Sequence, residues 1–298
     1  MSRQLKTGLF GGDCRADKLY IIERLLDRLN ALGVEIYIQR EFYSFLKNVL
    51  KKWPKVSCMS TDDMHHLDVA LSVGGDGTFL RTAALINRRR IPILGINTGR
   101  LGFLADVSED QIADTLTELT DGNYMTEERM LLELHTKGES VLQGYNHALN
   151  EVAVLKRDTS SMITIHTYLN DEYLTSYQAD GLLIATPTGS TAYSMSVNGP
   201  ILLPQSDNIV LSPVAPHSLN VRPLVIPGSH RIRLVVESCT QSFLTALDGR
   251  SEVMQIGTEL IVNKGSYTLS VIKRHKHTFY CTLREKLMWG ADVRVKQY

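Results

Sequence analysis

A strand, a glycine-rich turn and a helix follow one another directly near residue 70, and this succession constrains the fold more than any other feature of the chain. Residues 69–73 are mostly apolar and are bounded by turn formers, which predicts a buried strand. The glycines at 74–77 let the backbone bend sharply and approach a bulky ligand closely. Residues 78–86 predict a helix that Thr78 caps. The amides and the positive dipole at the start of this helix favour phosphate oxygens.

Asp76 is unusual in this turn, because a phosphate-binding loop would favour neutral or positive groups. A carboxylate beside phosphates is useful if it holds a metal ion or accepts a proton from a hydroxyl nucleophile. In the alternative interpretation, Asp76 only caps backbone amides of a strand-to-helix turn. For a Gly-Gly-Asp-Gly motif by itself this second interpretation is favoured, so the rest of the chain has to decide.

Length and composition indicate an ordinary globular protein. The chain has 298 residues, which is enough for two domains with their own cores. Its formal net charge is zero, so no overall field attracts nucleic acid or an anionic membrane. The N-terminal residues lack a secretory signal, and no apolar run approaches the roughly 20 residues of a membrane span. We therefore expect a soluble, cytoplasmic protein with neither nucleic-acid nor membrane partners.

Cysteine and histidine residues do not suggest a metal site. The chain has four cysteines, Cys14, Cys58, Cys239 and Cys281. They are far apart in the sequence, and we expect reduced, mostly buried thiols. The histidines at 65–66 and at 275 and 277 have no other ligands at zinc spacing, which favours surface histidines.

The first half of the chain alternates between strand and helix patterns. Apolar residues between 15 and 32 recur at helical spacing, for example, and an apolar strand pattern begins directly after Gly33. Such alternation predicts βαβ units, and therefore a mainly parallel sheet with helices on both faces. The expected strands are 4–10, 34–38, 69–73 and 91–97, and the expected helices are 15–32, 42–50, 78–86 and 108–119.

Two loops of this sheet are expected to share a ligand pocket. Ligands bind beyond the carboxyl ends of the strands in such sheets, and the segments 74–77 and 97–103 both lie at carboxyl ends. Arg81 is one helical turn past the glycines and could reach a bound phosphate or nucleotide. The alternative for Arg81 is an exposed helix arginine. The arginines at 88–90 favour a solvated helix end, where they complement the dipole.

After Gly122 the pattern changes from helical spacing to alternation, which predicts an all-β second domain. The flanks of Asn263-Lys264-Gly265 predict a hairpin between the strands 260–262 and 267–271. Residues 283–289 predict a helix in a tail that returns to the first domain. The expected division is 1–123 for an α/β nucleotide domain, 124–277 for a β-rich domain and 278–298 for the returning tail. The other expected strands are 131–135, 151–155, 163–169, 182–185, 224–226 and 231–236.

Two polar segments of the β-rich domain are not explained by strand formation. Asn150 and Glu151 adjoin an apolar strand and could bind ribose hydroxyls or an adenine amine, although a solvated strand start is favoured from spacing alone. The segment 178–181 leads through a short strand into 186–196, a loop rich in Ser and Thr. Caps account for one or two of these hydroxyls, and a loop that binds a sugar or phosphate would account for most.

Together these stretches resemble the NAD kinase family of ATP-dependent NAD 2′-phosphotransferases. The glycine-Asp turn alone is shared with diacylglycerol-type lipid kinases and phosphofructokinases. The string Pro-Thr-Gly-Ser-Thr-Ala-Tyr at 187–193, combined with Asn150-Glu151, is much more specific. The motifs follow the family's order, and the matching segments are 74–78, 97–104, 150–151, 180–181, 186–193, 198–200, 216–219 and 222–226.

The resemblance implies an α/β nucleotide domain, a β-rich NAD-binding domain and a site in the cleft between them. It implies that Asp76 is the general base for the 2′-hydroxyl of the adenosine ribose of NAD, with ATP as phosphoryl donor. A divalent metal, Mg²⁺ by preference, would bind through the phosphates, without an assigned protein ligand. Relatives assemble as dimers or tetramers, so a homo-oligomer is implied. The residues implied to bind substrate are Gly74, Gly75, Gly77, Arg81, Asn150, Glu151, Asp180, Thr191, Ala192, Tyr193, Ser194, Met195, Ser196 and Ala215.

The chain departs from the family pattern at a few positions. Gln178 stands where many relatives have arginine, Asn198 stands where a small residue is common, and the match at 248–250 is loose. Other enzyme classes fit less well. A dehydrogenase fingerprint would need glycine at Leu80, and the chain has no Walker motif. A lipid kinase would need an apolar acyl slot, and a dinucleotide-binding regulator without turnover would not need Asp76.

Overall fold

A computed structural model describes residues 4–12, 16–50, 53–60, 62–99, 102–137, 145–158, 161–275 and 277–289. The chain divides into two compact units. Unit 1 comprises Met1–Glu127 together with Ser270–Tyr298, and unit 2 comprises Glu128–Leu269. The sequence pattern places the corresponding boundaries at 124 and 278. Unit 2 is therefore inserted into the chain of unit 1.

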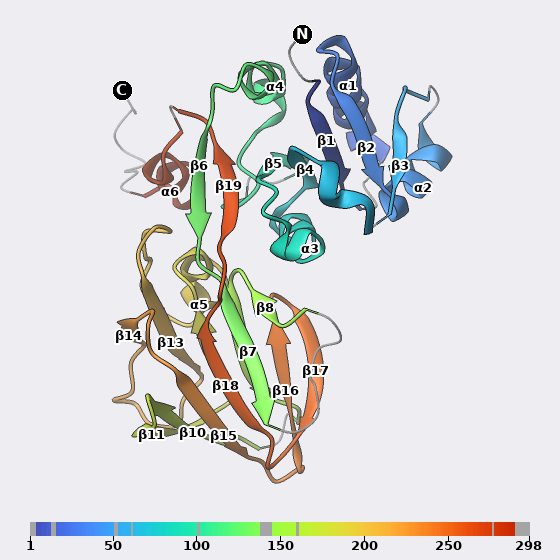
Figure 1. The fold of residues 1–298 in the computed structure, drawn as a ribbon. Coiled ribbons are helices and arrows are strands. Elements are labelled where there is room, and N and C mark those ends of the chain that lie inside the picture. Colours follow the sequence, from blue (N-terminus) through green and yellow to red (C-terminus); the bar gives the residue numbers. More distant parts are fainter. Residues whose placement is uncertain are drawn as a thin grey trace. The chain divides into compact units, whose positions relative to one another are not determined.

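Unit 1 is built on a mainly parallel sheet, as the alternating pattern predicts (Figure 1). The strands before the insertion pair in parallel, and β19, which follows it, pairs in parallel with β5. In spatial order the strands of this sheet are β3 (Ser57–Met59), β2 (Glu35–Gln39), β1 (Lys6–Phe10), β4 (Val69–Gly74), β5 (Ile93–Asn97), β19 (Leu269–Lys273) and β6 (Met125–Arg129). The chain thus returns to the first domain, as expected.

The helices of unit 1 cover the apolar residues of this sheet. Helix α1 buries a stripe that includes Ile22, Leu25 and Leu29, and the strand β4 is buried from Val69 to Val73. These residues belong to one continuous core, so helical spacing identified the buried face correctly. The helices are α1 (Leu19–Ala31), α2 (Arg40–Val49), α3 (Asp76–Ile86), α4 (Ile112–Thr120) and α6 (Phe279–Leu287), with 3₁₀ turns at Ala16–Lys18, Asp62–His66, Asn87–Arg89 and Glu109–Gln111.

Unit 2 is the antiparallel β domain that the alternating sequence predicts. Its core contains side chains from two sheets, for example Ile165 and Leu234 of one and Val154 and Ile184 of the other. One sheet has the order β11 (Glu172–Ala179), β10 (Ile163–Leu169), β15 (Ile232–Glu237), β18 (Glu259–Lys264), β7 (Leu132–Lys137) and β8 (His147–Ala148). The other has the order β14 (Leu224–Pro227), β13 (Asn208–Val214), β12 (Gly181–Ala185), β9 (Glu151–Lys156), β16 (Ser242–Leu247) and β17 (Arg250–Gln255).

The hairpin expected around Gly265 is wrong. Strand β18 pairs with β15 and β7 in unit 2, whereas β19 pairs with β5 in unit 1. The turn signal is real, since the amide of Gly265 donates to the carbonyl of Leu131 at 2.7 Å. The strands on either side of it, however, complete different sheets.

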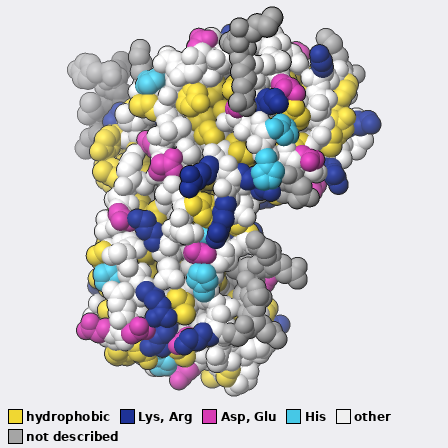
Figure 2. Space-filling model, viewed as in Figure 1, with side chains coloured by type: hydrophobic (Ala, Val, Ile, Leu, Met, Phe, Trp, Pro, Cys, Tyr) yellow, Lys and Arg dark blue, Asp and Glu magenta, His cyan; other side chains and the backbone are white. Residues whose placement is uncertain are grey.

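Side chains on the surface are mixed in charge. On the face shown in Figure 2, Lys and Arg side chains lie among Asp and Glu side chains. Arg231, for example, pairs with Asp171 at 2.9 Å. Three cysteines lie in the described part of the chain, and none is buried, because Cys58 and Cys239 are exposed and Cys281 is half-buried. The expectation of mostly buried thiols is therefore wrong for these residues. Among the described helices, none has the length and apolar character needed to span a membrane.

Candidate active site

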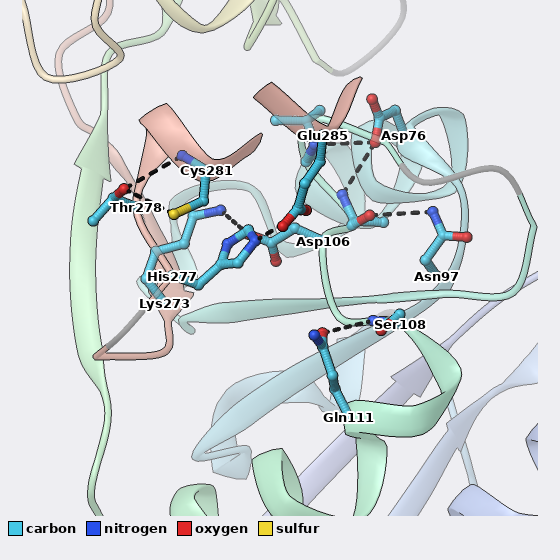
Figure 3. Close-up of polar contacts among 12 residues, drawn as sticks. Asp76, Asn97, Asp106, Ser108, Gln111, Lys273, His277, Thr278, Cys281 and Glu285 are labelled. Atoms are coloured by element: carbon cyan, nitrogen blue, oxygen red, sulfur yellow. Dashed lines mark hydrogen bonds and ion pairs between the residues drawn. The ribbon is translucent and has the colours of Figure 1, made fainter. Parts of the chain in front are cut away.

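Asp76 is held by the loop that follows the neighbouring strand. Its Oδ2 accepts a hydrogen bond from the Phe103 amide at 2.8 Å. Its Oδ1 accepts from the amides of Leu104 and Ala105 at 3.0 Å each, and Figure 3 shows two hydrogen bonds to one oxygen of Asp76. The carboxylate therefore does not cap its own helix. It connects the two loops that the sequence places at the carboxyl ends of adjacent strands, and Gly74 pairs with Asn97 in the sheet.

The turn before Asp76 depends on glycine. Gly74 has φ 156°, and a Cβ there would lie 2.4 Å from Thr78 Oγ1. A Cβ at Gly75 or Gly77 would meet no atom of the described residues within 4 Å, so the loop is open beside these two glycines. Helix α3 begins with Gly75 as its N-cap, so the prediction that Thr78 caps the helix is wrong. The sharp turn at Gly74 lets the helix begin at Asp76, two residues before the predicted start at Thr78.

Arg81 is exposed and points back along α3. Its Nη2 donates to Thr78 Oγ1 at 3.1 Å, and a Cβ on Gly12 would lie 3.2 Å from the same nitrogen. The guanidinium is therefore near the glycine turn without a carboxylate partner in the described residues. Arg89, by contrast, donates to the carbonyls of Leu85 and Ile86 at the end of the helix, where a cation complements the dipole as expected. Arg89 is half-buried, so the expected solvated position is wrong for this residue.

The loop that holds Asp76 is fixed by its own contacts. Asn97 Oδ1 accepts from the Gly99 amide at 2.7 Å, and Asn97 Nδ2 donates to the Ala105 carbonyl at 3.2 Å. Gly95 lets the loop return across β5, because a Cβ there would be 2.6 Å from the Cα of Ala105. Residues 100 and 101 of the family motif lie outside the described residues.

Next to the Asp76 loop lies a buried ion-pair cluster that the sequence analysis missed (Figure 3). Asp106 is 6% exposed, and its carboxylate lies 2.5 Å from Lys273 Nζ and 3.5 Å from His277 Nδ1. Burial raises the pKa of Asp106, but Lys273 and His277 outweigh it and lower the pKa to about 2. The expectation of a surface histidine is wrong for His277, whose side chain is 12% exposed and also pairs with Glu285 at 3.6 Å.

In unit 2, Asn150 and Glu151 are held by Asp248. The buried Asp248 carboxylate accepts from the amides of Leu149, Asn150 and Glu151 at 2.7 to 3.2 Å. Asn150 is buried, so the solvated strand start that spacing favoured is wrong. Burial and the charge of Asp248 raise the pKa of Glu151 to about 7. Within the described residues, the buried Oε2 of Glu151 has no hydrogen-bond partner.

The Thr186–Ser196 loop uses most of its hydroxyls to hold its own shape. Thr186 Oγ1 donates to the Leu149 carbonyl at 2.5 Å and accepts from the Gly189 amide at 3.0 Å. Gly189 allows the loop to pack on Asn150, whose carbonyl would lie 2.0 Å from a Cβ there. The expectation that ligand binding explains most of the hydroxyls is therefore wrong. Further internal bonds are donated by Ser190 to Pro187, by Thr191 to Thr188 and by Ser196 to Tyr193.

The loop nevertheless exposes part of its surface. The 3₁₀ turn Thr188–Thr191 leads into the short helix α5 (Tyr193–Ser196), where Tyr193 is 40% exposed and Ser194 is buried against Ser212. Ala192 and Met195 are half-buried, and Ser196 is exposed. Two other predicted residues lie at the ends of strands of the same sheet, since Asp180 directly precedes β12 and Ala215 directly follows β13. Asp180 pairs with Lys156 at 2.7 Å, and Ala215, after β13, has φ 44°, a strained conformation for a residue with a Cβ.

Each unit thus brings together its own share of the predicted residues. In unit 1 the glycine turn, Asp76 and Arg81 are neighbours, and in unit 2 Asn150 and Glu151 adjoin the Thr186–Ser196 loop. Asp106 and Lys273 gave no local sequence signal, because they are 167 positions apart. Among the described residues, no group of three His, Cys, Asp or Glu side chains is placed to hold a metal ion. An open glycine turn at a helix start, with a fixed carboxylate, characterises a phosphoryl-transfer enzyme.

Comparisons with known proteins agree with this class. Residues 18–124 match the family model of the ATP-NAD kinase N-terminal domain, and residues 149–274 match that of the ATP-NAD kinase C-terminal domain. An NAD kinase of Bacteroides fragilis is 50% identical over 98% of this chain and 100% of its own length. An NAD kinase of Porphyromonas gingivalis is 46% identical over 97% of this chain and 99% of its own. The chain belongs to the NAD kinase family, a family of phosphotransferases.

Solved structures share the fold. A yeast NADH kinase complexed with NADH has a TM-score of 0.88 at 22% identity, covering 99% of this chain and 90% of its own. An NAD kinase from Archaeoglobus fulgidus in complex with ATP has a TM-score of 0.76 at 24% identity, covering 95% of this chain and 99% of its own. An α/β unit followed by a β-rich unit is therefore the architecture of these relatives.

Proposed function

We propose that this protein transfers the γ-phosphate of ATP to the 2′-hydroxyl of the adenosine ribose of NAD, giving NADP and ADP. The observation that supports this proposal most is the state of Asp76. Its carboxylate is fixed by backbone amides at the start of α3, beside an open glycine turn. A fixed carboxylate at that place has a use when a hydroxyl must be oriented next to phosphates.

The hydrogen bonds of Asp76 indicate which oxygen acts as the base. A carboxylate has about four acceptor positions, two on each oxygen. Oδ1 accepts from both Leu104 and Ala105, whereas Oδ2 accepts from Phe103 within the described residues. Oδ2 therefore keeps a lone pair for the ribose hydroxyl. In the proposed step the ribose oxygen bonds to the γ-phosphorus, the bond from that phosphorus to the β,γ-bridging oxygen breaks, ADP leaves, and the hydroxyl proton passes to Asp76.

We propose that Mg²⁺ enters with ATP as part of the substrate. Mg²⁺ keeps oxygen ligands and commonly binds through substrate phosphates. Gly74, Gly75 and Gly77 would face the phosphates, and Arg81 would donate to them in place of Thr78.

Residues of unit 2 are proposed to bind NAD. The unpartnered Oε2 of Glu151 would accept a hydrogen bond from a sugar hydroxyl, which would satisfy a buried oxygen. Tyr193 would supply an exposed aromatic ring that contacts the dinucleotide. The other residues proposed to bind the dinucleotide are Asn150, Asp180, Thr191, Ala192, Ser194, Met195, Ser196 and Ala215.

The test is the formation of NADP from NAD, ATP and Mg²⁺ by the purified protein. The Asp76→Asn variant should lose about 10²- to 10⁴-fold in rate and still bind NAD, because the amide keeps the shape and loses the basic oxygen. Asp121→Asn, at the exposed end of α4, is the control and should keep full activity.

Other outcomes of this assay favour the rival classes. Tight NAD binding by the unmodified chain without any NADP would indicate a regulator. Phosphorylation of diacylglycerol or sphingosine would indicate a lipid kinase. The dimer or tetramer implied by the resemblance and the cytoplasmic location expected from the sequence stay predictions, which sedimentation and fractionation can check.

A further inference from the structure

Helix α6 is attached to the loop that holds Asp76. Phe279, the first residue of α6, lies with its ring 6.5 Å from that of Phe103, centroid to centroid. His277, just before the helix, contacts Asp106 of the same loop at 3.5 Å. Figure 3 shows the contact of His277 with Asp106, and Asp76 lies in the same view. The matched family domains end at residues 124 and 274, so α6 lies beyond both.

Lys286 of α6 is a half-buried cation that no anionic group contacts among the residues the structure describes. Its Nζ lies 5.8 Å from the ring centre of Phe103, close to the outer limit of about 6 Å for a cation–π contact. Within the described part of the chain, no hydrogen bond or ion pair holds this ammonium. The adjacent Glu285 pairs with His277 instead.

One of the carboxylates that act on Lys286, that of Asp76, belongs to the candidate phosphate site. Burial lowers the pKa of Lys286, and the carboxylates of Asp76, Asp106 and Glu285 act in the opposite direction. Asp106 is already paired with Lys273, and Asp76 is already bound by backbone amides. The Lys286 ammonium and the Asp76 carboxylate therefore both lie beside the Phe103 segment. Among the described contacts, no salt bridge joins these two groups.

We propose that Lys286 is a catalytic residue that binds the phosphoryl group during transfer, with its ammonium donating to non-bridging oxygens of the γ-phosphate of ATP. This inference rests on the proposed function and adds a residue to it. Lys286 stays protonated throughout. It neither gives nor takes a proton, and it offsets negative charge while the ribose oxygen bonds to phosphorus and the bridging oxygen leaves with ADP. A partly desolvated ammonium suits this task, because it has few water contacts to lose.

The opposing interpretation is that the Lys286 stem only covers the Phe103 ring. The Lys286→Met variant distinguishes the phosphate-binding interpretation from the packing interpretation, since methionine keeps an apolar chain of similar length and removes the charge. Lys286→Arg keeps the charge. Arg284→Met is the matched control, because Arg284 lies on the same helix, is exposed and donates to Cys281 Sγ.

The experiment measures NADP formation and, separately, the binding of inorganic tripolyphosphate to each full-length variant by calorimetry. Lys286→Met should lower kcat/KM for ATP and weaken tripolyphosphate binding by roughly 10- to 100-fold, the loss typical of one charged hydrogen bond. NAD affinity and the thermal midpoint should not change. Lys286→Arg should restore most of the loss, and Arg284→Met should match the unmodified protein.

Unchanged ATP kinetics and unchanged tripolyphosphate binding in Lys286→Met would overturn the inference. A fall in the thermal midpoint that accounts for the lost activity would overturn it as well, in favour of the packing interpretation. If the unmodified protein makes no NADP, the proposed function fails, and the tripolyphosphate comparison still decides the role of Lys286. If the unmodified protein fails to bind tripolyphosphate, the Lys286 inference fails with it.

Discussion

Asp76 has its position because residue 102 carries no side chain. A Cβ on Gly102 would lie 1.7 Å from Asp76 Oδ1, well inside any permitted contact. The close approach lets the amides that follow, from Phe103 to Ala105, reach the carboxylate. The position of the Asp76 carboxylate thus depends on a glycine, without a side chain, 26 positions later in the chain.

Gly102→Ala should therefore remove activity with little effect on folding. The new methyl group displaces the Asp76 carboxylate from its amides, and loss of a positioned base costs about 10²- to 10⁴-fold in rate. Gly99→Ala is the control in the same loop, because a Cβ there meets no described atom within 4 Å. NADP assays and thermal unfolding of both variants check this prediction, and equal activities would contradict it.

Glu151 shows how a buried carboxyl makes stability depend on pH. Its pKa is raised from 4.5 to about 7, so the folded state holds the proton more tightly than the unfolded state. The free energy of unfolding should then fall as pH rises from 4.5 through 7. Glu151→Gln removes the cost of ionising this buried carboxyl. The variant should be more stable than the unmodified protein by up to about 3 kcal/mol above pH 7, and the two should be about equally stable near pH 4.

Urea unfolding at a series of pH values measures this difference. Glu172→Gln, which changes an exposed carboxyl on β11, is the control and should show no such trend. If the difference in free energy of unfolding between Glu151→Gln and the unmodified protein stays constant with pH, the explanation is wrong. Since a sugar hydroxyl bound to Glu151 favours the charged form, NAD should also bind more tightly as pH rises towards 8.

At the scale of elements, an ion-pair cluster joins three separate parts of unit 1. Asp106 lies after β5, Lys273 ends β19, and His277 precedes α6. The pairs place β19 and α6 against the loop that holds Asp76. Pairing buried charges in this way is costly to undo, because breaking one pair leaves an uncompensated charge.

Asp106→Asn should loosen these elements in a pH-dependent way. The pKa of Asp106 falls from 3.8 to about 2 on folding, so its contribution is present above pH 3.8 and is lost as pH falls towards 2. The Asp106 hydrogen bond raises the pKa of His277, whose contribution is lost as pH rises through that raised pKa. The loss of stability, about 2 kcal/mol or more, should therefore be largest between about pH 4 and 6.5, above the ordinary pKa of Asp and below that of His.

Hydrogen exchange and urea unfolding check this prediction. Amides of α6 and β19 should exchange faster in Asp106→Asn, whereas Asp114→Asn, at an exposed site on α4, should leave them protected. Unchanged protection of α6 would show that its attachment depends on the aromatic contact of Phe103 with Phe279 alone.

At the scale of the whole molecule, unit 1 needs residues from both ends of the sequence to complete its sheet. Unit 2 is continuous from Glu128 to Leu269 and has its own core. Unit 1 is completed by residues from 270 onwards, because β19 pairs with β5 and lies between β5 and β6 in the sheet. Lys273, the partner of Asp106, arrives with the same segment.

Separate fragments should therefore differ in their ability to fold. Residues 128–269 alone should give a β-rich circular dichroism spectrum and a cooperative urea transition. Residues 1–127 alone lack β19 and α6, which exposes β5 and leaves Asp106 buried without Lys273, so they should unfold at much lower urea or fail to fold. A fragment of residues 1–127 as stable as the full chain would contradict this view.

Sequence by itself determined those features that depend on neighbours in the chain. The strand at 69–74, the face of α1 that is buried and the alternating strands of unit 2 all follow from local periodicity, which reflects the geometry of each element. Asp76 was singled out because a carboxylate is unusual in a glycine turn, but the local pattern alone favoured a capping role, and only the resemblance to the NAD kinase family implied a general base. The local signals failed where distant strands compete, as at Gly265, where the turn joins two different sheets.

Tertiary structure alone decided what each polar side chain touches. Asp76 is bound by amides 27 to 29 residues away, Asp248 binds amides 97 to 99 residues away, and Lys273 reaches Asp106 across 167 residues. Residue types could name these groups, but only the pairing of strands brings them within about 3 Å, where a hydrogen bond forms. Several hydroxyls of the Thr186–Ser196 loop, such as those of Thr186 and Ser190, bond within the protein for the same reason, since buried polar atoms are usually hydrogen-bonded. Thr188 Oγ1 is the exception in this loop, because it is buried without a partner among the described residues.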